Sequence, residues 1–217
     1  FNWTFDTTRP TMAITATKPD GVTNVSSGST SNDATLVLTF TSSETPTDFA
    51  VGDISVLDGA ISNFTQSLSN TKIYTATLTP SQNNVTCIVD VVQNKYTDAA
   101  GNNNLASPSF TWLFNNGVPT MTIAVTDTTT TPNATVNPAG YTNASSLLLT
   151  FTSSEATNTF SVGDISVING TIQTNSFSAT STTTVYTATF LPSATGTCSV
   201  TIAQNAYTNL AGTGNNQ

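Results

Sequence analysis

The chain has 217 residues, enough for one large domain or for two of about a hundred residues each. Only 7% of the residues are charged, against about 25% in ordinary soluble domains. The net charge of −8 and the four basic residues exclude nucleic acid and anionic membrane surfaces as partners, because both need clustered Lys and Arg. No apolar run reaches the ~20 residues of a membrane span, so we expect no membrane insertion.

Short strands with alternating apolar side chains follow one another along the first half of the chain. An alternation with period two predicts strands that are buried on one face. The clearest predicted strands are residues 1–6, 36–40, 74–78, 87–91 and 110–115. Gly, Asn and Pro residues separate them at short intervals, and no segment keeps helical spacing for three turns. About seven strands in ~110 residues is typical of a β-sandwich.

The second half of the chain repeats the first. Residues 36–44 recur as residues 147–155 with one difference, and residues 51–56 recur unchanged as residues 162–167. Both repeats have the same spacing of 111 residues, from position 36 to 147 and from 51 to 162. A long, ordered repeat of this kind predicts two copies of one domain in tandem.

Several short blocks carry a resemblance to a known family. They are Ser-Glu at 43–44, Asp-Ile at 53–54, Tyr-Thr-Ala at 74–76 and Asp-Ala-Ala-Gly-Asn at 98–102. These blocks resemble the bacterial Ig-like repeat family, whose members run in tandem along adhesins and other surface proteins. The resemblance covers both copies and implies an all-β fold of two tandem immunoglobulin-like sandwiches, a stalk or assembly role, and no catalytic activity. The second copy has Asn209 where the first has Asp98, which puts in doubt any role that needs this carboxylate.

The predicted domain boundaries leave one strand out of place. We expect residues 1–7 to be a strand that belongs to a neighbouring domain, residues 8–116 to form the first domain, and residues 117–217 to form a second domain that lacks its final strand. The reason is that Phe1 and Trp3 match Phe110 and Trp112, at the end of the first copy. The second copy reaches Gln217 before any such strand.

Two hypotheses explain this strand. In the first, Phe1, Trp3 and Phe5 of one chain fill the groove of the next chain's second domain by donor-strand complementation, so that copies of the protein form a head-to-tail polymer. Burial of each large aromatic side chain would contribute roughly 1.5–3 kcal/mol. In the second hypothesis, the chain is a segment of a longer tandem array, and the final strand follows in the same polypeptide.

The two cysteines occupy equivalent positions of the copies, at Cys87 and Cys198. Equivalent positions in tandem sandwiches lie too far apart for a disulfide, which tolerates about 7 Å between Cα atoms. We therefore expect both to be buried thiols that act as small apolar side chains. A nucleophilic role would lack a histidine partner, since the chain has no histidine.

Asn-x-Ser/Thr sequons are frequent in this Ser- and Thr-rich chain, and chance alone accounts for their number. They stand at Asn2, Asn24, Asn63, Asn84, Asn133, Asn143 and Asn169. Their places near turns and on outward positions predict that all of them face solvent. Several are expected to carry covalent glycans if the source is a eukaryote, and none in most bacteria.

Metal and catalytic chemistry have weak support. Glu44, Asp53 and Asp98, with Asp6 beside them, are the candidate calcium ligands of the first copy, and Glu155 and Asp164 are those of the second. No spaced ligand loop is visible, and solvated turn carboxylates explain these residues better. We therefore expect no cofactor. Glu44 and Asp53 are also candidates for a glycosidase pair, yet a ~110-residue sandwich with short turns offers no cleft for them. No enzyme is expected.

The sequence thus predicts a structural subunit of an extracellular or cell-surface fibre, assembled head to tail by donor-strand complementation and glycosylated. The alternative is a stalk segment of a surface adhesin whose ligand-binding tip lies elsewhere.

Overall fold

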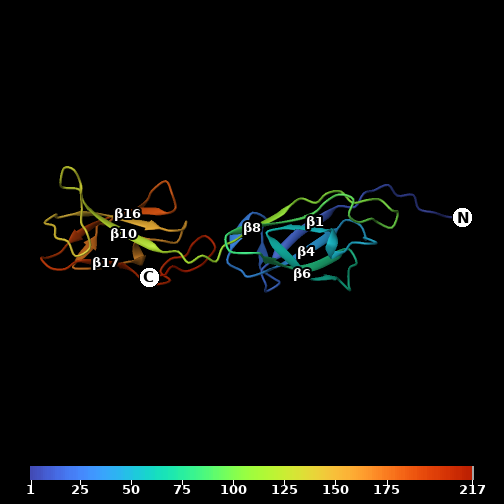
Figure 1. Cartoon of the computed structure of the whole chain (residues 1–217), viewed down its shortest axis with the longest axis horizontal. Coiled ribbons are helices and arrows are strands. Elements are labelled where there is room, and N and C mark those ends of the chain that lie inside the picture. Colours follow the sequence, from blue (N-terminus) through green and yellow to red (C-terminus); the bar gives the residue numbers. More distant parts are fainter. Residues whose placement is uncertain (217) are drawn as a thin grey trace. The chain divides into compact units, whose positions relative to one another are not determined.

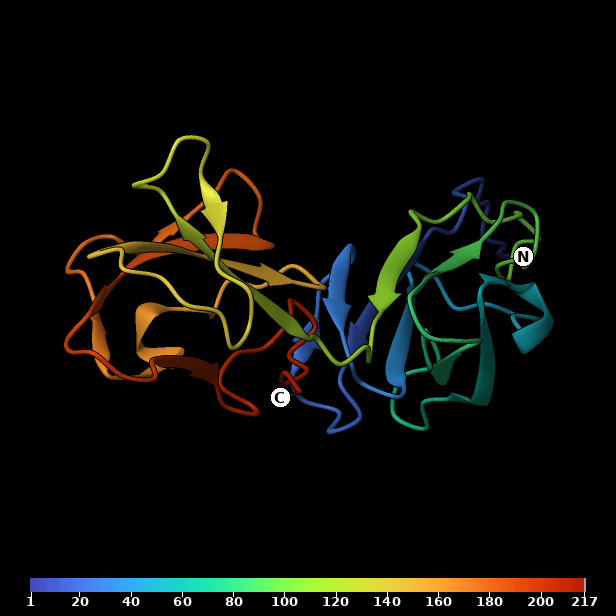
Figure 2. The same cartoon turned by 60° about the vertical axis from the view of Figure 1, so that its left-hand side comes forward.

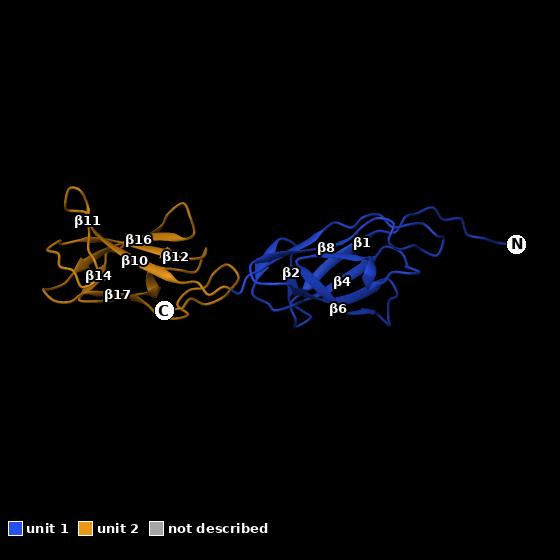
Figure 3. Ribbon diagram, viewed as in Figure 1, with its two compact units in different colours: residues 1–116 blue, residues 117–217 orange. Residues whose placement is uncertain are grey.

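The computed structural model describes residues 1–216 and contains two compact units, which divide between Asn116 and Gly117 (Figure 3). Each unit is built from β-strands and one short 3₁₀ turn (Figure 1). The predicted all-β fold with two immunoglobulin-like domains is confirmed. None of the helices in the described residues is long and apolar enough to cross a membrane.

The first unit is a sandwich of two sheets. The larger sheet runs, in spatial order, through β2 (Asn24–Val25), β1 (Met12–Thr17), β4 (Leu36–Ser42), β7 (Ile73–Pro80) and β6 (Gly59–Gln66). The other sheet runs through β3 (Ser29–Ser31), β9 (Phe110–Phe114), β8 (Val85–Val91) and β5 (Ile54–Leu57), with the 3₁₀ turn η1 (Val51–Asp53) before β5. All the neighbours pair antiparallel except β3 and β9, which pair parallel.

The core of the first unit follows the predicted alternation. On β4, Leu36, Leu38 and Phe40 are fully buried, while the residues between them lie partly open to solvent. The largest fully buried side chain belongs to Trp112 of β9, and its indole N–H donates a hydrogen bond of 3.1 Å to Ser31 Oγ. Aromatic and aliphatic side chains on alternate positions of both sheets therefore form one continuous core.

The second unit repeats the larger sheet but only part of the smaller one (Figure 2). Its larger sheet runs through β11 (Ala134–Thr135), β10 (Met121–Asp127), β12 (Leu147–Ser153), β16 (Val185–Pro192) and β14 (Gly170–Ile172), with β15 (Ser178–Ala179) also paired to β16. The other sheet holds only β13 (Ile165–Ile168) and β17 (Ser199–Ile202), after the turn η2 (Val162–Asp164). Among the described residues of this unit, no strand takes the place of β3 or β9.

Residues 1–7 lie outside every strand of the first unit, and the segment trails away from the sandwich (Figure 1). The part nearest the sandwich is tied to it: Asn102 Nδ2 donates to the Asp6 carbonyl at 3.2 Å, and Thr8 N donates to Asp6 Oδ1 at 2.8 Å. Asp6 therefore contacts the first unit, although the sequence places it in a strand of a neighbouring domain.

Candidate functional site

The smaller sheet of the second unit has an unpartnered side. In the first unit, β8 pairs with β5 on one side and with β9 on the other, and Cys87 lies opposite Trp112. In the second unit, β17 pairs with β13 alone among the described residues. We call the side of β17 that faces away from β13 the open edge.

The two cysteines show how this difference changes the side chains. Cys87 is fully buried next to β9, and burial raises the pKa of its thiol. Cys198, its counterpart, is exposed. The prediction that both thiols are buried is therefore wrong for Cys198, because the tryptophan-bearing strand that covers Cys87 has no counterpart beside β17 within the described residues.

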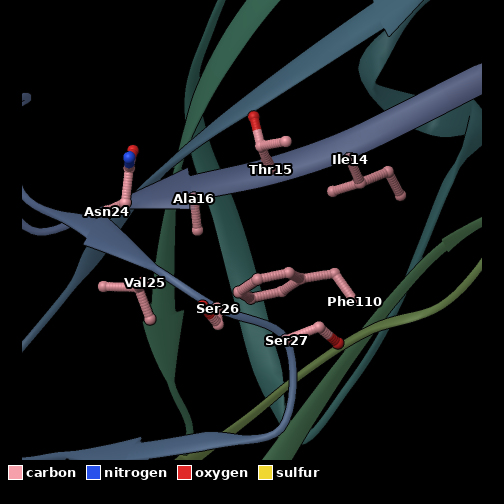
Figure 4. A pocket seen from close by; sticks show the side chains of 8 residues that line it. All are labelled: Ile14, Thr15, Ala16, Asn24, Val25, Ser26, Ser27 and Phe110. Atoms are coloured by element: carbon pink, nitrogen blue, oxygen red, sulfur yellow. The ribbon is translucent and has the colours of Figure 1, made fainter.

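A second difference lies where β9 begins. A shallow groove there is lined by Ile14, Thr15, Ala16, Asn24, Val25, Ser26, Ser27 and Phe110. The ring of Phe110 points beneath Ala16 and lies beside Val25 (Figure 4). The counterparts of these two residues, Val125 and Val136, are only partly buried. Phe110 thus closes the space between the sheets in the first unit, and none of residues 117–216 matches it.

Residues 1–5 carry the same residue types that close the first unit. Phe1, Trp3 and Phe5 are 111%, 77% and 83% exposed, and the Phe1 and Trp3 rings lie 6.0 Å apart. Their counterparts in β9 are Phe110, Trp112 and Phe114, all of which are buried. The same aromatic pattern is therefore buried in a core in β9 and largely exposed to solvent in residues 1–5.

A cluster of carboxylates lies where the chain enters the first unit. Asp6, Glu44 and Asp98 each bring an oxygen within 4.8 Å of the others. Desolvation and the neighbouring charges of Asp6 and Asp98 raise the pKa of Glu44. Desolvation would also raise the pKa of Asp98, but hydrogen bonds from Asn102 and from backbone N–H groups outweigh it and hold this pKa below its ordinary value.

Of the candidate ligands of the first copy, Asp53 does not join this cluster. Asp53 Oδ2 instead accepts a hydrogen bond of 2.8 Å from Ala50 N at the start of η1. Asp6 takes its place, since the segment before β1 brings its side chain to Glu44 and Asp98. The three oxygens can share a proton or contact a hard cation, but calcium needs six to eight oxygen ligands.

In the second unit, an asparagine takes the place of one carboxylate of this cluster. Asn209 stands at the position of Asp98, and its Nδ2 donates to Glu155 Oε2 at 2.8 Å. Its Oδ1 accepts from Ala211 N at 3.0 Å and from Thr213 N at 2.9 Å, as Asp98 Oδ1 does from the matching loop. The loop geometry therefore needs only the oxygen, and the charge of Asp98 is not required for it.

Replacing Asp98 with asparagine is expected to reproduce the second unit's arrangement and to lower the pKa of Glu44 toward its ordinary value. A raised Glu44 pKa means that the folded domain holds a proton that the unfolded chain has released, so stability falls as the pH rises from 4.5 through the raised value. This loss of stability with rising pH should be smaller in Asp98→Asn. Carboxyl NMR titration of Glu44 measures the pKa directly, and an unchanged midpoint would refute the argument.

The seven sequon asparagines lie mostly on the surface. Asn2, Asn24, Asn63, Asn84, Asn133 and Asn143 are exposed. Asn169 is only partly exposed, and its Nδ2 donates to the Ala194 carbonyl at 2.9 Å, so the expectation that all seven face solvent is wrong for this residue. The Asn169 amide therefore joins the bend between β13 and β14 to the loop that follows β16.

Comparison with known proteins agrees with this architecture. The family model described as "Bacterial Ig-like domain" matches residues 6–112 and again residues 115–217. None of the curated proteins compared with the chain matches it.

Two solved structures show a distant likeness. InvD of Yersinia pseudotuberculosis is 18% identical, with a TM-score of 0.41, over 92% of this chain and 54% of that one. The N-terminal part of the bacterial S-layer protein SbsC is 16% identical, with a TM-score of 0.29, over 68% of this chain and 41% of that one. The chain thus spans about half the length of each of these structures.

Proposed function

Because the chain belongs to the bacterial Ig-like domain family, we propose that it is a structural segment of an extracellular or cell-surface fibre whose sandwiches follow one another head to tail. Bacterial Ig-like domains typically serve as non-catalytic structural modules, and two in tandem suit an extended array. The same proposal includes covalent glycans on the six exposed sequon asparagines and no catalytic activity.

We further propose that chains join by strand donation, with residues 1–5 of one chain completing the second unit of the next. One observation carries this proposal: no described residue pairs with β17 at its open edge, while Phe1, Trp3 and Phe5 expose the same aromatic pattern that β9 buries beside β8. Burial of these three side chains would favour assembly, and main-chain hydrogen bonds would fix its direction. The contact is heterologous, so it propagates and does not close into a dimer.

Deletion of residues 1–5 tests strand donation. The deletion keeps Asp6, whose carbonyl accepts a hydrogen bond from Asn102. Negative-stain electron microscopy should show long fibres for the intact chain and single, unassembled particles for the shortened one. A double substitution of Asn2 and Thr4 by alanine is the matched control, because these side chains alternate with the aromatic ones and should leave the fibres intact. Fibres of unchanged length after the deletion would contradict the proposal.

A stalk segment of a surface adhesin is the second candidate, and one observation favours it. The strand that completes the first unit, β9, leads directly into the second unit along the same polypeptide. A following domain could supply the strand for the second unit in the same way. Purified chains would then remain unassembled at all concentrations, with or without residues 1–5.

A further inference from the structure

We infer that the second unit accepts the incoming strand between two neighbouring segments and in one register. We call the open edge of β17, with the residues just before it, the first wall, and residues 137–142 the second wall. Residues 1–5 of a second copy lie antiparallel to β17 with Trp3 opposite Cys198, and parallel to residues 140–142. This inference rests on the strand donation proposed above and adds to it the position of every residue of the donor strand.

The register of the incoming strand along the first wall follows from the pairing of β8 with β9 in the first unit. There Phe110 lies opposite Val89, Trp112 opposite Cys87, and Phe114 opposite Val85. The matching positions in and before β17 are Val200, Cys198 and Gly196. Phe1 therefore faces Val200, Trp3 faces Cys198, and Phe5 faces Gly196. A slip of one residue would turn the three aromatic side chains toward solvent.

The second wall is a turn that both units share. In the first unit, Ser29 N donates to the Ser26 carbonyl at 3.2 Å, and Gly28 between them has a φ of 86°. In the second unit, Gly140 N donates to the Asn137 carbonyl at 2.8 Å, and Ala139 has a φ of 61°. Both turns thus use a left-handed residue at the same place, which is uncommon for alanine.

In the first unit, this turn holds the edge of β9. Gly28 N donates to the Thr111 carbonyl at 2.7 Å, and Asn115 N donates to the Ser31 carbonyl at 3.0 Å. The equivalent bonds in the second unit would join Ala139 N to the Asn2 carbonyl and Asp6 N to the Thr142 carbonyl. Residues 140–142 form no strand, whereas their counterparts form β3 by pairing with β9. The incoming strand is therefore expected to convert residues 140–142 into a strand.

Side chains on both walls suit the same register. Trp112 donates its indole N–H to Ser31 Oγ, and the counterpart of Ser31 is Thr142, an exposed residue that also carries a hydroxyl. Phe1 would lie against Val125 and Val136, the partly buried counterparts of the residues beside Phe110. One contact is lost: Ser27 Oγ accepts from Thr111 N at 3.0 Å, and its counterpart Pro138 has no hydroxyl.

Pairs of introduced cysteines test the register in the full chain, with Cys198 replaced by serine so that the remaining native thiol is the buried Cys87. Asn2→Cys with Ser199→Cys joins directly opposed residues, whose Cα atoms in an antiparallel pair lie ~4.5–5.5 Å apart, within reach of a disulfide. Asn2→Cys with Thr201→Cys is the matched control, because a diagonal pair lies ~7–8 Å apart. Thr4→Cys with Tyr141→Cys tests the second wall.

Mild oxidation should give a ladder of covalent oligomers on a non-reducing gel for the Ser199 and Tyr141 pairs, and at most a tenth of that yield for the Thr201 pair. A stronger ladder from the Thr201 pair would overturn the register while leaving strand donation in place. A ladder from the Ser199 pair without one from the Tyr141 pair would overturn the second wall. If the intact chain forms no fibres and none of the pairs crosslinks, the proposed strand donation itself fails.

Discussion

Replacing Trp112 with alanine is expected to lower the free energy of unfolding of the first domain by about 3–5 kcal/mol, the usual range for removing a buried aromatic side chain. Trp112 is fully buried in β9, its ring contacts Phe114 at a centroid distance of 5.7 Å, and its indole N–H bonds to Ser31 Oγ. The variant loses this packing and leaves a cavity in the core of the first unit. The second domain has a core of its own, so its unfolding transition should not move.

Differential scanning calorimetry of the full chain, under conditions in which it is dissociated into single chains, resolves this prediction, with Trp3→Ala as the matched control. Trp3 is exposed in the unassembled chain, so its removal should change the stability of neither domain. The pair of variants distinguishes a tryptophan that is buried in a domain core from one that is exposed until the chains assemble. Equal destabilisation by both substitutions would show that Trp3 already packs against the first domain.

Replacing Asn104 with alanine is expected to cost the first domain about 2–4 kcal/mol, because several buried backbone groups would lose their partner together. Asn104 is fully buried. Its Oδ1 accepts from Lys95 N at 2.7 Å and from Tyr96 N at 3.1 Å. Its Nδ2 donates to the carbonyls of Val92 at 2.9 Å and Leu105 at 2.7 Å. The Asn104 side chain therefore satisfies four backbone groups and joins residues 92–96 to residues 104–105.

The same role belongs to Asn215 in the second domain, whose Oδ1 accepts from Tyr207 N at 3.0 Å and whose Nδ2 donates to the Ala203 carbonyl at 2.9 Å. Asn215→Ala should therefore lower the second unfolding transition and leave the first in place. Chemical denaturation followed by circular dichroism measures both effects. A change within about 0.5 kcal/mol for Asn104→Ala, the range of ordinary surface substitutions, would contradict the assignment.

The sequence predicts those parts of the structure that depend on local pattern. Alternation on residues 36–40 and 74–78 correctly indicates which side chains form the core, because side-chain direction in a strand follows from period two alone. The repeat identifies the two domains for the same reason. The strand alternation does not reveal Asn104, although its recurrence at Asn215, in the spacing of the repeat, is a signal that points to it.

Features that depend on residues far away in the sequence could not be predicted from local pattern. Cys198 has the same strand pattern as Cys87, but its exposure is decided by what lies beside β17. The short strand β3 exists through its pairing with β9, and nothing in its own three residues predicts it. Likewise, Asp6 joins Glu44 and Asp98 because of the path that the chain takes into β1.

Thiol labelling of the wild-type chain tests the central claim, that the open edge of the second domain receives a strand on assembly. In the dissociated chain, a maleimide should label the exposed Cys198 rapidly and the buried Cys87 only on unfolding. In assembled fibres, Cys198 lies beneath Trp3 of the next chain and should become as protected as Cys87. Labelling of Cys198 at the same rate in fibres and in dissociated chains would contradict the account.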